Sequence, residues 1–83
     1  MTLNQELIEF LREQGYENLR ELPDETVVGT LELMYTRAIC IGLNRWSWEK
    51  RFCFENKELA LEELAKLTTG DDEPTGYIAR RGN

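Results

Sequence analysis

Catalytic side chains are sparse in this 83-residue sequence, which contains no histidine. A serine or cysteine nucleophile needs a neighbour that takes its proton or lowers its pKa, and histidine is the usual one. Ser47 therefore has no histidine base. Arg51 and Cys53 would share one face of an expected strand, so a reactive thiol stays open as an alternative. The main prediction is a non-enzymatic protein without catalytic residues.

The sequence also lacks the side chains and spacings that metal and cofactor sites need. Cys40 and Cys53 stand without a second pair or any histidine, so they indicate neither a disulfide framework nor a closed zinc site. We interpret them as small buried hydrophobic side chains, with a cross-strand disulfide as the alternative. Residues 71–73 lack the ligand spacing of a calcium loop, and no glycine-rich phosphate motif occurs. We expect no metal and no cofactor.

Charge is distributed unevenly along the chain, whose net charge is -6. Residues 1–32 carry eight acidic and two basic side chains, and residues 55–76 carry seven acidic and two basic ones. Residues 33–54, by contrast, carry four basic side chains and one acidic one, and residues 77–83 carry two basic ones. The expected helices are thus acidic and the expected strands basic, which leads to two binding hypotheses.

The first hypothesis places the contact on the acidic helices. Glutamates spaced by three and four residues form a negative stripe that can face the basic surface of a larger partner protein. Two tryptophans add either exposed binding anchors or core side chains. The residues of this candidate partner-binding site are Glu6, Glu9, Glu13, Glu17, Trp46 and Trp48. Solubility and helix propensity also account for such glutamates, and this alternative stays open.

The second hypothesis is nucleic-acid binding by the basic strands. Cations beside aromatic platforms suit single-stranded nucleic acid. The candidate residues are Arg37, Arg45, Lys50, Arg51, Arg80 and Arg81. A net charge of -6 repels phosphates at long range, so we rank this function second.

Apolar spacing predicts the elements that position these residues. A helix is expected over residues 3–14, closed by Gly15, with Thr2 and Gln5 as a capping box. A second helix is expected over 24–35, where Gly29 indicates either a close backbone or simple tolerance. Alternating patterns predict strands over 36–43, 47–54 and 77–80. Asn56 begins a third helix that runs to Leu67 and is ended by Gly70.

The two central strands are expected to form a hairpin whose register follows from burial. Paired residue numbers must add to an odd value if Ile39, Ile41, Phe52 and Phe54 share one face. The natural choice pairs Ile41 with Phe52 and Ile39 with Phe54, and places Cys40 opposite Cys53. The predicted fold is α+β: a small antiparallel sheet, made of this hairpin and a short C-terminal strand, packed against two or three helices in the order α-α-β-β-α-β.

Residues 1–83 are expected to form a single domain, because a chain of this length buries only one modest core. No apolar run reaches the length of a membrane span, and Glu6 and Glu9 interrupt any signal sequence. Unpaired cysteines favour a reduced cytoplasm. An uncovered second face of the sheet would make a homodimer a further alternative.

Across residues 36–82 the sequence resembles a group of small uncharacterised proteins encoded in bacterial genomes and their phages or other mobile elements. The similar pieces are Ile41-Gly42-Leu43, Arg51-Phe52-Cys53-Phe54, the following helix, and Glu73-Pro74-Thr75-Gly76-Tyr77-Ile78. Where that group often has Trp-Asp-Gly after the helix, this chain has Leu67-Thr68-Thr69-Gly70. The resemblance implies an inhibitor or modulator that binds host machinery, of the anti-CRISPR or anti-restriction type.

Overall fold

The first helix forms where the sequence predicts it. In the computed structural model, which describes residues 3–82, α1 spans Leu3–Glu13. Its end is a glycine cap: Gly15 has a φ of +103°, its N–H donates to Arg12 O, and the Tyr16 N–H donates to Leu11 O. The proposed capping box includes Thr2, which lies outside the described residues.

The predicted second helix is wrong, because residues 17–32 form a β-hairpin. β1 spans Glu17–Glu21 and β2 spans Val27–Glu32, and the strands pair antiparallel. A turn joins them: the Asp24 carboxylate accepts the Thr26 N–H, and Glu25 adopts a φ of +73°. Val27, Val28 and Thr30 are β-branched residues, which favour strands, and β2 is buried on both faces. Such a strand shows no alternation, so its apolar positions also fit helical spacing.

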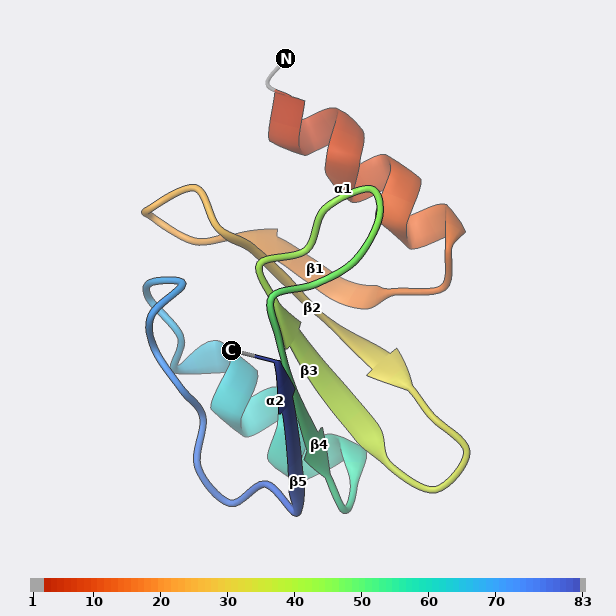
Figure 1. The fold of residues 1–83 in the computed structure, drawn as a ribbon, viewed down its shortest axis with the longest axis vertical. Helices are drawn as coiled ribbons and strands as arrows, with labels where there is room; N and C mark the ends of the chain where they lie inside the picture. Colours follow the sequence, from red (N-terminus) through yellow and green to blue (C-terminus); the bar gives the residue numbers. More distant parts are fainter. Residues whose placement is uncertain (1–2, 83) are drawn as a thin grey trace.

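Three further strands complete the sheet, in the order β1-β2-β3-β4-β5, with every neighbouring pair antiparallel (Figure 1). β3 spans Arg37–Ile41, β4 spans Lys50–Phe54 and β5 spans Ala79–Gly82. α2 spans Lys57–Ala65 and is capped by Asn56, whose side-chain oxygen accepts the Leu59 N–H. Residues 3–82 form an α+β fold with five strands and two helices, and its order α-β-β-β-β-α-β replaces the predicted α-α-β-β-α-β.

The register of the β3–β4 hairpin keeps the predicted parity but differs by two residues. Ile39 pairs with Phe52 and Ile41 with Lys50, so the apolar set still shares one face. Cys40 consequently lies opposite Arg51 rather than Cys53, and both cysteines are free thiols. The strands are shorter than expected because residues 42–49 form a loop instead of continuing the ladder.

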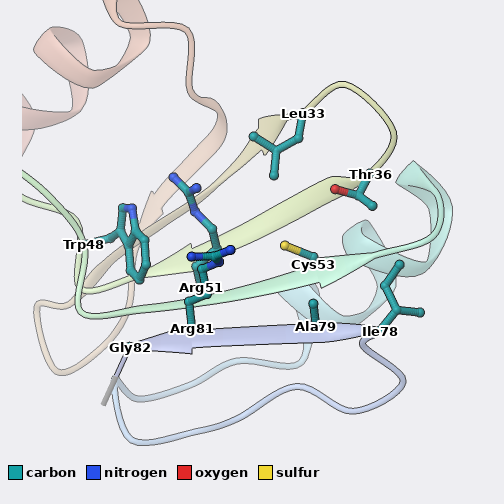
Figure 2. A pocket seen from close by; sticks show the side chains of 9 residues that line it. All are labelled: Leu33, Thr36, Trp48, Arg51, Cys53, Ile78, Ala79, Arg81 and Gly82. Atoms are coloured by element: carbon teal, nitrogen blue, oxygen red, sulfur yellow. The ribbon is translucent and has the colours of Figure 1, made fainter.

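The two faces of the sheet are covered to different extents. On one face α2 packs over the main core, which contains Leu22, Val28, Ile39, Ile41, Phe52, Phe54, Ala60, Leu64 and Leu67. On the other face Leu7, Ile8, Phe10 and Leu11 of α1 pack near β1, against a cluster that includes Val27, Cys40 and Leu43. This helix lies at the β1 end of the sheet, which leaves the same face of β4 and β5 open (Figures 1 and 2).

Candidate functional site

An open hollow occupies the uncovered face of β4 and β5 and encloses about 820 Å³. We call it the arginine hollow. Figure 2 shows its side chains rising from the strands, with Trp48 at one end and Ile78 at the other. It is lined by Leu33, Thr36, Trp48, Arg51, Cys53, Ile78, Ala79, Arg81 and Gly82.

Strand pairing determines which side chains face the hollow. Arg51 pairs with Arg81, and Cys53 pairs with Ala79, so the four side chains stand on one face. Phe52 and Phe54, which alternate with Arg51 and Cys53 along β4, belong to the α2 core instead. The β2–β3 turn adds Leu33 and Thr36, whose backbones are joined by a 2.9 Å hydrogen bond from Leu33 N–H to Thr36 O. The hollow therefore depends on four of the five strands and their connections.

Arg51 is held in place on several sides. Its Cζ atom lies 4.6 Å from the centroid of the Trp48 ring, a cation–π geometry. The guanidinium also neighbours Tyr16 and Cys40. Burial raises the pKa of the Tyr16 hydroxyl and of the Cys40 thiol, and the Arg51 charge opposes this rise in both groups. The Nε atom of Arg51 is buried and has no hydrogen-bond partner among residues 3–82.

Arg81 places a second positive charge directly across from Arg51. Like charges at directly opposed positions destabilise a sheet unless something compensates them. Among residues 3–82, no carboxylate lines the hollow, and none of the ion pairs includes Arg51 or Arg81. Two positive charges therefore stand side by side without an anionic partner from the described residues, on a surface whose other lining residues are mostly apolar.

The remaining cations of the predicted nucleic-acid site lie elsewhere. Arg37 forms ion pairs with Glu17 at 2.8 Å and with Glu32 at 3.4 Å. Lys50 and Arg80 share Glu73, at 4.0 Å and 3.1 Å. Arg45 stacks over the Phe10 ring at 5.0 Å. Of the six predicted cations, the structure thus brings only Arg51 and Arg81 together in the hollow.

The two tryptophans have different environments. Trp46 is 89 % exposed on the β3–β4 loop, where the Asn44 side-chain oxygen accepts the N–H groups of Trp46 and Ser47. Trp48 is half-buried, packs against the α1-side cluster and forms one end of the hollow. One tryptophan is therefore a loop residue held toward solvent, and the other belongs to the candidate site.

The predicted acidic stripe is divided between two elements. Glu6, Glu9 and Glu13 are exposed on α1. Glu17 begins β1 and pairs with Arg37, so it does not continue the helical surface. The acidic surface of α1 therefore ends at Glu13, and the role of these four glutamates in binding a partner stays a prediction.

Nucleophilic chemistry has little support from the cysteines. Cys40 is fully buried, and burial raises the pKa of its thiol, which disfavours the reactive thiolate. Cys53 lines the hollow but is only 9 % exposed. No group of three or more histidine, cysteine, aspartate or glutamate side chains that could hold a metal ion occurs within residues 3–82. The opposed Arg51 and Arg81 of the arginine hollow are instead suited to binding an anion.

Sequence reasoning missed several lining residues of the hollow, namely Leu33, Thr36, Ile78, Ala79 and Gly82. Leu33 was expected inside a helix, and only a β2–β3 hairpin brings it beside β4. The sequence did offer one signal for the hollow. Arg51 and Cys53 are two residues apart, which places a charge and a small apolar side chain on the same face of the expected strand.

Comparisons with protein-family models, curated proteins and solved structures found no match to this chain. Neither helix in the described part of the chain has the length and apolar character needed to cross a membrane.

Proposed function

We propose that this protein is a non-enzymatic protein-interaction module that binds its partner through the arginine hollow. The partner presents a negatively charged group flanked by apolar side chains. One observation carries the proposal: Arg51 and Arg81 lie opposite each other on neighbouring strands, and no carboxylate among residues 3–82 compensates them in the hollow.

The composition of the hollow favours a protein partner. Tryptophan and arginine are enriched among the few interface residues that contribute most of the binding energy, and these residues lie in the apolar centre of an interface. Leu33 and Ile78 provide apolar walls, and Ile78 is 60 % exposed in the free protein. A single-stranded nucleic acid would instead bring a row of phosphates toward a chain of net charge -6.

The hollow is a better-supported contact than the acidic surface of α1. Glu6, Glu9 and Glu13 are exposed glutamates of a kind that surface helices commonly carry for solubility. The resemblance to mobile-element proteins adds the proposal that the partner is a larger host protein and that occupying its surface inhibits or modulates it.

Peptide binding followed by Trp48 fluorescence tests the function. Trp46→Phe removes the other tryptophan at an exposed position, so that only the hollow is monitored. Ten-residue peptides of alternating Glu and Leu, Gln and Leu, or Lys and Leu are titrated beside a ten-nucleotide oligothymidine. We expect saturable binding of the Glu peptide only. Arg81→Gln should weaken it by about tenfold to a hundredfold, since a hydrogen bond to a charged group contributes ~1.5–3 kcal/mol.

Arg12→Gln is the matched control, because Arg12 is an exposed arginine of α1 outside the hollow. It should leave the affinity unchanged. Equal binding of the Gln and Glu peptides would contradict the role of the arginines. Binding of the oligothymidine alone would establish the nucleic-acid alternative, and binding of none of the probes would refute the function.

A further inference from the structure

The arginine hollow concentrates more positive charge than one carboxylate can balance. Arg51 and Arg81 form a directly opposed pair, so their Cβ atoms are expected about 4.5–5.5 Å apart. A bound carboxylate would neutralise one guanidinium and leave the other in mostly apolar surroundings. A dianion would balance both.

Hydrogen-bond capacity favours the same class of anion. Each guanidinium carries five N–H donors in a planar fork, and the two forks come from different strands. Some donors of Arg51 face Tyr16 and Cys40, and the others are available to a ligand. A carboxylate has two oxygens, whereas a phosphoryl group has three terminal oxygens and a charge of about -1.5 to -2 at neutral pH. The phosphoryl group can therefore accept hydrogen bonds from both arginines at once.

Arg51 is prepared for such a ligand before binding. Trp48 stacks on its guanidinium at 4.6 Å, and Tyr16 and Cys40 flank it, so little side-chain freedom is left to lose. Its buried Nε atom has no hydrogen-bond partner among residues 3–82. This held arginine lies next to an exposed one, Arg81, which is free to close on a ligand from the β5 side.

We infer that the group held between Arg51 and Arg81 is a dianionic phosphoryl group, carried by the partner as a phosphorylated serine or threonine beside apolar residues. This inference rests on the proposed function, and it names the anion that the hollow selects. The apolar walls at Leu33 and Ile78 then contact the residues that flank the phosphorylated side chain.

The test compares three peptides that differ only at one central position, which is phosphoserine, glutamate or serine between leucines. Trp46→Phe protein reports binding through Trp48. At pH 7.5 we expect the phosphoserine peptide to bind at least tenfold more tightly than the glutamate peptide. The preference should fall as the pH is lowered through about 6, where the phosphate takes up its second proton.

Inorganic phosphate and sulfate, each without a peptide, distinguish a phosphorylated segment from a small-anion site. Both should bind more weakly than the phosphoserine peptide, and sulfate should show no pH dependence between 5 and 8. If phosphate alone binds as tightly as the phosphoserine peptide, the hollow is a small-anion site and the inference is wrong.

Substitutions assign the effect to the two arginines. Arg51→Gln and Arg81→Gln should each reduce the preference for phosphoserine over glutamate to twofold or less, and Arg45→Gln, which lies on Phe10, should retain it. Arg81 is exposed at the sheet edge, so Arg81→Gln keeps the test valid if Arg51→Gln does not fold.

The outcomes separate the inference from the function on which it rests. Equal affinities for phosphoserine and glutamate peptides would overturn the inference and leave the interaction module standing. A phosphoserine preference that survives Arg81→Gln would also overturn it. Binding of neither peptide would refute both proposals.

Discussion

Arg20 should be one of the main stabilising residues outside the apolar core. It lies in β1, half-buried, and its Nη2 atom donates to Leu64 O at 2.8 Å and to Leu67 O at 2.7 Å, at the C-terminal end of α2. Two hydrogen bonds from a charged donor contribute about 3–6 kcal/mol together. The buried Nε atom of Arg20 has no hydrogen-bond partner in the described part of the chain, which costs about 1–3 kcal/mol that a substitution would recover. Arg20→Met should therefore lower the free energy of unfolding by about 2–3 kcal/mol.

Urea unfolding followed by far-ultraviolet circular dichroism measures this loss, and a thermal scan should show a fall in Tm of roughly 10–20 °C. Arg20→Lys keeps a positive charge at the helix C-terminus and should lose about half as much. Arg12→Met, at an exposed position on α1, is the control for removing an arginine. A loss for Arg20→Met no larger than the control value would refute the reasoning and the hydrogen bonds on which it depends.

Three further predictions concern the turns, the sheet and the hollow. Gly29→Ala would place a Cβ atom 2.7 Å from Leu19 Cδ2 and 3.1 Å from the Glu17 carbonyl oxygen, so urea unfolding should show a loss of about 1–3 kcal/mol. Backbone hydrogen bonds, chiefly from Gly70 to Asp24 and from Thr68 to Asp72, lower the pKa of each carboxyl below its ordinary value of 3.8. Their contribution to stability is therefore complete above that value and is lost as the pH falls below it; thermal scans from pH 6 to 2.5 should show a smaller decline for Asp24→Asn combined with Asp72→Asn. Cys53, 9 % exposed, should react with a thiol reagent more slowly in the folded than in the unfolded protein, and more slowly still with the phosphoserine peptide bound, as mass spectrometry of the labelled residue would show.

The helices could be predicted because their signals are local. Gly15 ends α1 and Asn56 begins α2 through hydrogen bonds to backbone groups only a few residues away. The parity of the β3–β4 hairpin was predictable for a similar reason, since alternation alone decides which side chains share a face. Parity does not fix the register, however, because a shift by two residues keeps every side chain on its face. The Cys40–Cys53 pairing was wrong for that reason.

The β1–β2 hairpin could not be read from the apolar pattern. Val27 and Val28 face opposite cores, one under α1 and the other under α2, so β2 has no polar face to produce alternation. Only tertiary contacts reveal it as a central strand. The low helix propensity of Gly29 left two interpretations open, a close backbone or simple tolerance. The structure favours the first, because the Glu17 carbonyl oxygen of β1 lies 3.1 Å from where a Cβ atom would stand.

The sequence predicted which kinds of residue form the candidate site, but it did not predict which of them lie together. Arg51, Arg81 and Trp48 were all among the predicted binding residues. Which of the predicted cations can bind a ligand depends, however, on the ion pairs that the fold gives the others. Arg37 is neutralised by Glu17 because β1 folds beside β2, a pairing that the sequence prediction did not contain. Selecting these two arginines from the six candidate cations therefore required the complete strand order.

The net charge of the chain also bears on which anions the hollow accepts. At physiological ionic strength charges are screened beyond about 8 Å, so a short segment with one phosphoryl group interacts mainly with Arg51 and Arg81. A long nucleic acid extends past the hollow toward the exposed glutamates of α1, such as Glu9 and Glu13, and its additional phosphates are repelled there. The acidic surface thus acts against extended polyanions, while the hollow attracts one compact dianion. Reversing Glu9 and Glu13 to lysine should accordingly increase oligothymidine binding and leave the affinity for the phosphoserine peptide within about twofold.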